Sequence, residues 1–281
     1  MEQTIRKSRG EVDRRVVLVT GASSGIGRSC AEYLAGRGLR VFGASRSVPE
    51  GSGAGSVTSL AMDVRDEGSV ARAVAILLER AGRIDAVVNN AGFGLAGALE
   101  ETSAEEVGEQ MDVNVLGVLR VTRAVLPTMR RQGSGHVINI GSIGGLLAVP
   151  FQGMYSASKF ALEGMMECLR MEVRPFGIRV VLIEPGDHRT SFTENRRLAE
   201  ASSGNTVYRT RMERAIGRMS ADEQGGPDPE RIARLVGRVI GTANPRLRYT
   251  IGPGSQRAAV MLKRLMPYAV VERILRSYYG I

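Results

Sequence analysis

The chain has 281 residues, of which 43% are hydrophobic, and it contains 35 glycines. This length and apolar content suffice for one large hydrophobic core, and the glycines indicate many tight turns of the α/β kind. The two cysteines and two histidines are too few for a metal cluster, so we expect neither a structural zinc nor a catalytic metal.

The formal net charge is +9, which would suit nucleic acid, anionic lipid or a dinucleotide phosphate as a ligand. Residues 1–14 form a polar N-terminal arm without the apolar segment of a secretory signal, and no apolar run is long enough to span a bilayer. We therefore expect a cytoplasmic protein. Cys30 and Cys168 lie far apart in helical patterns, which predicts two buried thiols in a reducing compartment.

The first predicted β-α unit runs from a buried strand into a glycine-rich turn. Residues 15–20 form an apolar, β-branched run typical of parallel sheets, and a helical pattern covers residues 30–37. The glycines between them permit a tight turn, let the backbone approach a pyrophosphate and place it at the positive end of the helix. The spacing G-x-x-x-G-x-G differs from the usual G-x-G-x-x-G. The cofactor contacts predicted here are Gly21, Ser23, Ser24, Gly25, Ile26 and Gly27.

The second strand, residues 40–45, leads to the position that reads the adenosine ribose. An NAD site needs an acid there for the 2′-hydroxyl, whereas an NADP site needs a cation for the 2′-phosphate. Ser45 and then Arg46 follow in this chain, so we favour NADP(H), with Ser24 as a second phosphate contact. The alternative is a solvent-exposed Arg46 and NAD(H) as cofactor. The small residues at 49–56 predict a flexible connection.

Strands and helices continue to alternate through residue 186. Further strands are predicted at 57–62, 84–89, 136–141 and 178–183, and helices at 67–80, from about Ser103 to Arg131, and at 155–173. Glu106 lies at capping-box distance from Ser103. A helix at 230–240 and a strand at 247–251 complete the pattern. It predicts a single α/β domain over residues 15–252, a doubly wound parallel sheet of the Rossmann type.

Tyr155 and Lys159 are four residues apart in a predicted helix, so their side chains share one face about 6 Å apart. A phenol ionises at about pH 10 in water, and a neighbouring ammonium stabilises the phenolate, which suits acid/base catalysis near neutrality. Most isolated Tyr-x-x-x-Lys matches are surface pairs. This one gains weight from the phosphate-binding turn at the start of the same chain.

Together these motifs resemble the short-chain dehydrogenase/reductase family, in its single-domain subfamily. The resemblance covers residues 15–190, with all motifs in the family's order. They are TGASSGIG, Asp63-Val64, NNAG at 89–92, Asn114, Ser142, Tyr155-x-x-x-Lys159 and Pro185-Gly186 with Thr190. The stretch NNAGFGLAGALE and the residues from Ser142 onward look most like the branch of 17β-hydroxysteroid and retinol dehydrogenases.

The resemblance implies a role for each of these residues. Tyr155 would give a proton to the carbonyl oxygen in reduction, or take it in oxidation, while a hydride moves to or from the nicotinamide. Lys159 would hold the nicotinamide ribose and lower the Tyr155 pKa, and Ser142 would bind the substrate oxygen. Asn114 would help to hold a water that links Lys159 to solvent. The other implied cofactor contacts are Asp63 and Val64 at the adenine, Asn90, Ala91 and Gly92 on the adenosine side, and Pro185, Gly186 and Thr190 at the nicotinamide.

Residues 187–226 are predicted to form a lid over the substrate. Relatives commonly place smaller or apolar residues where this chain has Asp187-His188-Arg189, so these three side chains either contact a polar group of the substrate or face water. His188 as a second acid/base is a further alternative. Apolar walls would suit a lipophilic ketone or alcohol, although each wall residue could equally belong to the core. The candidates are Phe93, Leu95, Leu146, Val149, Met154, Phe192, Tyr208, Met212 and Met219.

Residues 253–281 form a basic amphipathic tail, with five cations and one acid in a helical pattern that Pro267 interrupts. The tail would pack on its own domain, on a second subunit or on a membrane surface. It lacks the clustered lysines and interleaved aromatic residues of a nucleic-acid site, so we expect no nucleic acid.

We therefore expect an NADP(H)-dependent oxidoreductase for a steroid-, retinoid- or polyketide-like carbonyl compound. The resemblance implies a homodimer or homotetramer. One alternative is a non-catalytic NADP(H)-binding regulator, for which a broken tetrad would be typical, whereas the tetrad here is intact. Others are a peripheral membrane protein acting through its tail and an epimerase or dehydratase that uses the same cofactor site.

Overall fold

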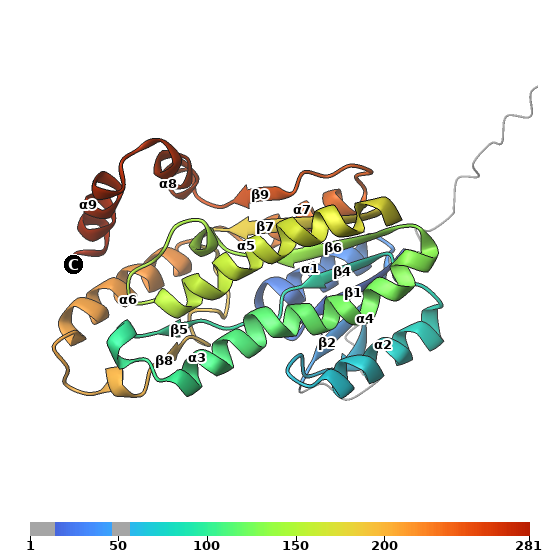
Figure 1. Cartoon of the computed structure of the whole chain (residues 1–281), viewed down its shortest axis with the longest axis horizontal. Helices are drawn as coiled ribbons and strands as arrows, with labels where there is room; N and C mark the ends of the chain where they lie inside the picture. The colour runs from blue at the N-terminus through green and yellow to red at the C-terminus, as the bar shows by residue number, and fades with distance from the viewer. Residues whose placement is uncertain (1–14, 47–56) are drawn as a thin grey trace, which may run out of the picture.

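The computed structural model describes residues 15–46 and 57–281, so the predicted polar arm and the connection at 49–56 lie outside the described residues. Within these ranges, a seven-stranded parallel sheet has the order β3-β2-β1-β4-β6-β7-β9 (Figure 1). The strands are β1 (Val16–Thr20), β2 (Arg40–Ser45), β3 (Val57–Ala61), β4 (Ala86–Asn89), β6 (Gly135–Ile140), β7 (Ile178–Pro185) and β9 (Arg248–Ile251). The predicted Rossmann-type sheet is confirmed. Its order reverses between β1 and β4, where such sheets bind ligands.

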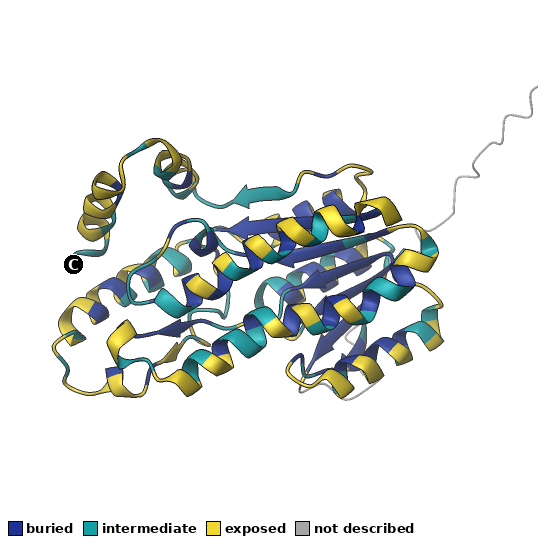
Figure 2. Cartoon of the chain, in the orientation of Figure 1, coloured by how far each residue is buried: buried dark blue, intermediate teal, exposed yellow. Residues whose placement is uncertain are grey.

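Helices cover both faces of the sheet, because its strands are apolar on both sides (Figure 2). One core lies under α2 (Glu67–Ala81), α4 (Gly117–Gln132) and α5 (Gly153–Val173). The other lies under α1 (Gly25–Gly36) and α7 (Glu230–Ile240). All five residues of β1 are buried between these two layers. Packing on both faces of the sheet thus fixes the strand ends, where the candidate site lies.

The long helix predicted from Ser103 to Arg131 is divided in the structure. Its start is as predicted, since Ser103 and Glu106 form the capping box at the beginning of α3 (Ala104–Met111). A π-helical turn, Asp112–Leu116, then separates α3 from α4. The wider turn contains Asn114, and π-helical turns occur mostly at functional sites. The sequence pattern did not predict this turn, because a π insertion leaves the helical periodicity on either side intact.

A small two-stranded sheet and three helices of the C-terminal third lie beside the main sheet. The short strands β5 (Leu95–Ala96) and β8 (Arg197–Leu198) pair in parallel, and α6 (Arg209–Gln224) follows them. The tail folds into α8 (Gly254–Leu265) and α9 (Tyr268–Tyr279), divided at Pro267 as the sequence predicted. Both helices project from the body beyond the end of β9 (Figure 1). Short 3₁₀ turns occupy Leu99–Glu101, Ile143–Gly145, Arg174–Phe176 and Ala201–Ser203.

The two cysteines differ in their exposure. Cys30 is buried under α1, and burial raises the pKa of its thiol to about 12. The prediction that Cys168 is buried is wrong, because it lies on the face of α5 that points away from the core. In the described part of the chain, no helix is long and apolar enough to cross a membrane, and no group of three potential metal ligands occurs.

Candidate active site

Tyr155 and Lys159 lie one helical turn apart on α5, with the Lys159 Nζ atom 5.8 Å from the centre of the Tyr155 ring. Both side chains are buried. The Lys159 ammonium donates a hydrogen bond of 2.9 Å to the Ile140 carbonyl at the end of β6. This bond ties the helix face to the strand that delivers Ser142, so the sheet and the helix together fix the lysine.

Ser142 follows β6 in an extended conformation and faces Tyr155. Its Oγ accepts a 3.0 Å hydrogen bond from the Gly144 N–H, and the hydroxyl also forms a hydrogen bond with the Tyr155 phenol. Two hydroxyl groups from different elements therefore meet at one point. That point is where a carbonyl oxygen would receive both a hydrogen bond and a proton.

Burial sets the protonation of this pair. It raises the pKa of Tyr155 to about 12, against the opposing effect of the Ser142 hydrogen bond. It lowers the pKa of Lys159 to about 8, while an ionised Glu184 would act in the opposite direction. At neutral pH, Tyr155 is thus a neutral phenol beside a protonated lysine. The arrangement offers a proton donor next to a positive charge.

Asn114 is buried in the π-helical turn, and its amide is fully engaged with protein groups. Its Oδ1 accepts the Phe93 N–H at 3.1 Å, and its Nδ2 donates to the Phe93 carbonyl at 3.0 Å and to Ser158 Oγ at 3.1 Å. The side chain therefore ties the segment after β4 to α5 and leaves no amide hydrogen for a water.

A polar cavity of about 400 Å³ lies beyond the ends of β1, β2 and β3. All residues predicted to bind the glycine-turn and adenosine parts of a dinucleotide line it, from Gly21 through Arg46, Asp63 and Val64 to Gly92, except Gly27. Gly27 lies beneath it. A Cβ at Gly27 would overlap the Gly21 carbonyl and the Asn90 amide, so only glycine allows this turn.

The start of α1 suits a phosphate. Ser24 is the N-cap residue but makes no side-chain cap, and the first turn contains no acid, so the helix N–H groups at its positive end remain available. Asn90 donates to the Thr20 and Gly21 carbonyls at 3.1 Å and 3.2 Å and thereby holds the turn in shape. The residues present therefore fit a nicotinamide dinucleotide.

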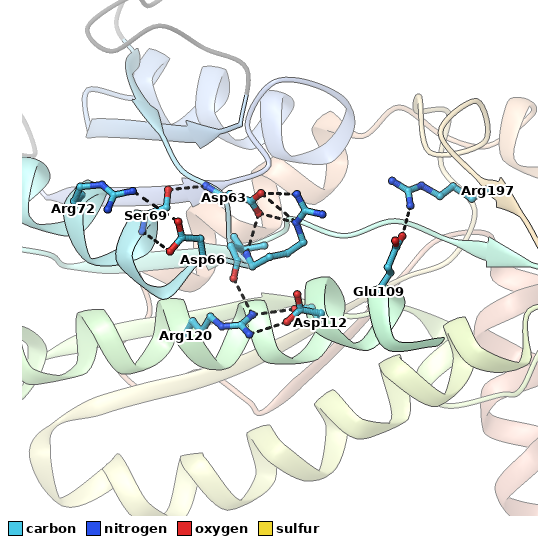
Figure 3. A network of polar contacts seen from close by, with 10 residues as sticks. Asp63, Asp66, Ser69, Arg72, Glu109, Asp112, Arg120 and Arg197 are labelled. Atoms are coloured by element: carbon cyan, nitrogen blue, oxygen red, sulfur yellow. Dashed lines mark hydrogen bonds and ion pairs between the residues drawn. The ribbon is translucent and has the colours of Figure 1, made fainter. Parts of the chain in front are cut away.

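Charged groups at the adenosine edge are paired, with one exception. Asp63 binds Arg65 through two hydrogen-bonded nitrogens, the shorter bond measuring 2.7 Å, and Arg65 holds the pKa of that carboxyl below its usual range. Glu109 on α3 pairs with Arg197 on β8 at 2.7 Å (Figure 3). Arg46 is exposed on the cavity rim and forms no ion pair with any residue in 15–46 or 57–281.

A second cavity, of about 410 Å³, adjoins the first and contains Tyr155, Ser142 and Lys159 in its wall. Phe192 packs against Tyr155, with ring centres 5.5 Å apart, and lines both cavities. Thr190 also lies between them, and Pro185 and Gly186 line the second. The catalytic candidates thus line the second cavity, and Phe192, which packs against Tyr155, connects them to the first.

The walls of the second cavity differ in part from the predicted set. Phe93, Val149, Phe192 and Met219 line it as predicted. Leu146 and Met154 do not, because Leu147 presents its side chain instead and Met154 is turned from the face of α5 that carries Tyr155. Other predicted wall residues lie elsewhere: Leu95 is buried in β5, Tyr208 donates to Glu100 at the surface, and Met212 lines a separate hollow beside α6. The wall residues that the sequence did not suggest include a group from α8 and α9: Ala259, Leu262, Ile274, Leu275, Tyr278 and Tyr279.

Asp187-His188-Arg189 is divided between the cavity and the surface. Asp187 lines the cavity and is bound by Gln256 of α8, whose amide oxygen accepts the Asp187 N–H at 2.9 Å and whose amide nitrogen donates to the carboxylate. Burial raises the pKa of Asp187 to about 6. His188 Nδ1 lies 2.9 Å from the Gly186 carbonyl, which can only accept, so Nδ1 carries the proton. Arg189 is exposed.

Burial lowers the pKa of His188, so its imidazole is neutral at pH 7, and its buried Nε2 has no partner among the described residues. His188 is nevertheless a lining residue of the cavity. Gln256, which binds Asp187, and Glu184, which accepts the Ser142 N–H, were not suggested by the sequence. Only the position of Glu184 directly before Pro185 could have drawn attention to it.

Comparison with known proteins places this geometry among characterised relatives. The family model for short chain dehydrogenases matches residues 15–201. A 3-ketodihydrosphingosine reductase of Bacteroides thetaiotaomicron is 40% identical over 95% of this chain and 98% of its own length. Human 17-beta-hydroxysteroid dehydrogenase type 1 is 38% identical over 84% of this chain and 77% of its own. A short chain dehydrogenase/reductase from Burkholderia phymatum, solved in complex with NAD, superimposes with a TM-score of 0.77 at 27% identity, covering 93% of this chain and 95% of the other.

Proposed function

The chain belongs to the short-chain dehydrogenase/reductase family of oxidoreductases that act on CH–OH groups, and we propose that it interconverts a lipophilic ketone or aldehyde and its alcohol with NADP(H). The observation that carries the proposal is that Tyr155, Ser142 and Lys159 line an apolar cavity that adjoins the polar cavity at the glycine turn. The apolar cavity accommodates a steroid-, retinoid- or polyketide-like molecule, and the named relatives act on a long-chain ketone and on steroids.

In this reaction the bound nicotinamide supplies or accepts the hydride. The glycine turn, Arg46 and the Pro185-Gly186 segment hold the cofactor. Ser142 binds the carbonyl oxygen while Tyr155 donates its proton to it, and the Lys159 cation stabilises the tyrosinate that remains. Because burial raises its pKa to about 12, Tyr155 is a neutral phenol at neutral pH and can donate the proton that reduction of a carbonyl requires.

Arg46 supports NADP(H) over NAD(H). It is the cation on the rim of the adenosine end that has no acidic partner in the described ranges, since Arg65 and Arg197 are both paired. A 2′-phosphate would provide that partner. NAD(H) remains the alternative, and the Burkholderia relative was solved with NAD.

The test is absorbance at the nicotinamide band with NADPH and with NADH, against steroid, retinoid, long-chain and aromatic carbonyl compounds. We expect NADPH oxidation, and a loss of roughly 100-fold to 10,000-fold in kcat for Tyr155→Phe with NADPH binding retained. Tyr33→Phe, on α1 away from both cavities, is the matched control. Tight NADPH binding without turnover of any carbonyl would instead support a non-catalytic regulator.

A homodimer or homotetramer is the proposed assembly. Leu116, Leu119, Phe160 and Met171 are exposed on α4, α5 and the turn before α4, although they are large and apolar. Exposed apolar side chains on neighbouring helices are typical of subunit interfaces. Light scattering of the full chain should give two or four copies, and a monomer at all concentrations would contradict this.

A second candidate function is docking on an anionic membrane through α8 and α9, favoured by the outer surface of these helices. Arg257, Arg264, Arg273 and Arg276 are exposed there and form no ion pair within the described ranges. The exposed apolar residues on the same helices that do not line the cavity are Met261, Leu265, Tyr268 and Val270. Because the inner side of both helices lines the substrate cavity, a lipophilic substrate would enter from the bilayer.

Sedimentation with phosphatidylglycerol vesicles tests this second function without removing the cavity wall. The variant Arg264→Ser/Leu265→Ser/Arg273→Ser should lose vesicle binding, and added salt should weaken binding by the unmodified protein. Arg72→Ser/Arg80→Ser, on α2, is the control. Equal pelleting of all three proteins would contradict the membrane role. A concentration-dependent dimer that is lost only in the α8–α9 variant would instead assign this surface to contact with a second subunit.

A further inference from the structure

Glu184 is a buried carboxyl group behind the candidate active site. It lies on β7 directly before Pro185, the last residue of the strand, and is 1% exposed. Its Oε2 accepts the Ser142 backbone N–H at 2.7 Å. A Cβ on Gly141 would overlap this carboxyl group, so the end of β6 is shaped to let Glu184 approach. The carboxyl thus holds the backbone of the residue whose hydroxyl faces Tyr155.

Glu163 meets Glu184 from the helix side. It lies one turn after Lys159 on α5 and is 8% exposed. The Oε1 atoms of both acids are buried, and neither has a donor among the residues that the structure describes. Burial and the hydrogen bond with Glu163 raise the pKa of Glu184 well above its usual range. Two ionised carboxylates would repel strongly here, whereas one shared proton gives both Oε1 atoms a partner.

The cations around the Glu163/Glu184 pair can balance one negative charge. Arg248 of β9 binds Glu163 and also Glu167, one turn further along α5. Lys159 is the other cation that faces the pair, and its hydrogen bond goes to the Ile140 carbonyl instead. One arginine thus already binds two acids, and Glu184 forms no ion pair with any cation in residues 15–46 or 57–281.

We propose that Glu184 is a positioning residue, held as a neutral carboxylic acid by a proton that it shares with Glu163, and that it fixes Ser142 for catalysis. The hydrogen-bonded chain runs from Arg248 through the Glu163 carboxylate and the Glu184 acid to the Ser142 N–H. The role in catalysis rests on the proposed oxidoreductase function, whereas the shared proton does not.

The neutral state also matters for Lys159. A second ionised carboxylate beside it would raise the lysine pKa and draw the Lys159 ammonium toward the carboxylates and away from Tyr155. With Glu184 neutral, the positive charge of Lys159 stays available to Tyr155. The pair therefore sets both the position of the serine and the charge balance of the lysine.

Substitutions at Glu184 test the positioning role. In Glu184→Gln, the amide can donate to Glu163 and still accept from Ser142, so kcat should stay within about threefold, with an unchanged pH–rate profile. Glu184→Leu leaves the Ser142 N–H without an acceptor, so kcat should fall roughly 10-fold to 100-fold while the KM for NADPH stays the same. Glu167→Gln, at the exposed end of the network, is the control. An equal loss in the Gln and Leu variants, or a pH profile displaced in the Gln variant, would overturn the proposal.

Infrared spectroscopy tests the shared proton without turnover. At pH 8, Asp187 is ionised, so a protonated carboxyl C=O band in the unmodified protein, lost in Glu184→Gln, would identify Glu184. No such band would overturn the proposal even where Glu184→Leu fails to fold. A clear band in a protein that reduces no carbonyl compound would keep the pair and reject the oxidoreductase function instead.

Discussion

The two adjoining cavities are built from different parts of the chain and in different ways. The cofactor cavity is formed mainly by strand ends and turns of residues 20–113, with backbone groups and paired charges on its surface. The substrate cavity takes its walls from residues 140–192, from α6 and from the two last helices. The first cavity depends on close backbone approach, and the second on side chains from distant elements.

The cofactor cavity therefore depends on the backbone of the fold, whereas the substrate cavity depends on the side chains that form its walls. Every nicotinamide dinucleotide carries the same pyrophosphate, and a turn that only glycine allows can bind it. A substrate pocket can change its walls without disturbing the sheet, because α8 and α9 project beyond it (Figure 1). Substitutions in the two cavities should therefore differ in kind: loss of binding in the first, and changes in preference or stability in the second.

The largest effect is expected from Gly27→Ala. The new methyl group would overlap the Gly21 carbonyl and the Asn90 amide, so the turn must open and overpacking should cost about 1–3 kcal/mol. Fluorescence titration should then detect no NADPH binding. Gly36→Ala, at the other end of α1 with no atom within 4 Å of the added group, should bind NADPH normally and gain about 0.5–1 kcal/mol. Normal binding by Gly27→Ala would contradict the glycine-based cofactor cavity.

A smaller effect is expected from Arg46→Ser, which removes the cation but leaves the turn intact. The loss of a charged hydrogen bond should raise the KM for NADPH roughly 10-fold to 100-fold and leave the KM for NADH unchanged. Arg28→Ser, which removes an exposed arginine paired with Glu32 on α1, should change neither value. Steady-state kinetics with both cofactors test this prediction. If the ratio of the KM for NADPH to the KM for NADH is the same in Arg46→Ser and the unmodified protein, Arg46 does not select NADP(H), and NAD(H) becomes the favoured cofactor.

The smallest effect is expected in the substrate cavity, from Asp187→Asn. The pKa of Asp187 is raised to about 6, so ionisation costs stability as the pH rises from about 4 to 6, and the full cost applies above 6. The Asn variant keeps its contact with Gln256 and should be about 1–2 kcal/mol more stable at pH 8, and no different at pH 4.

Denaturant unfolding at both pH values checks this prediction. Glu79→Gln, at an exposed site on α2, should show no such pH dependence. If the unmodified protein and Asp187→Asn unfold alike at pH 8, then Asp187 is ionised in the folded protein without penalty, and the substrate cavity is wetter than its walls indicate.

Local signals in the sequence determined most of the sheet and the cofactor cavity. The capping box at Ser103, the strand at 40–45 and the helix at 230–240 were predicted with their bounds, because caps and periodicity act within one element. The glycine turn and the Tyr155/Lys159 spacing are local in the same sense. They indicated the family, which the comparisons confirm, and they predict the chemistry.

Tertiary structure alone decided the rest. Two contacts join residues far apart in the sequence, and no local pattern encodes them. Gln256 binds Asp187 across 69 residues, and Lys263 donates to the Leu146 carbonyl across 117 residues. Three further features depend on how the helices pack against the sheet. They are the exposure of Cys168, the presence of Leu147 rather than Leu146 in the cavity wall, and the contact between Glu184 and Glu163. The sequence by itself therefore determined the fold and the reaction class, whereas packing decided the walls of the substrate cavity, because those walls come from elements that meet only in the folded chain.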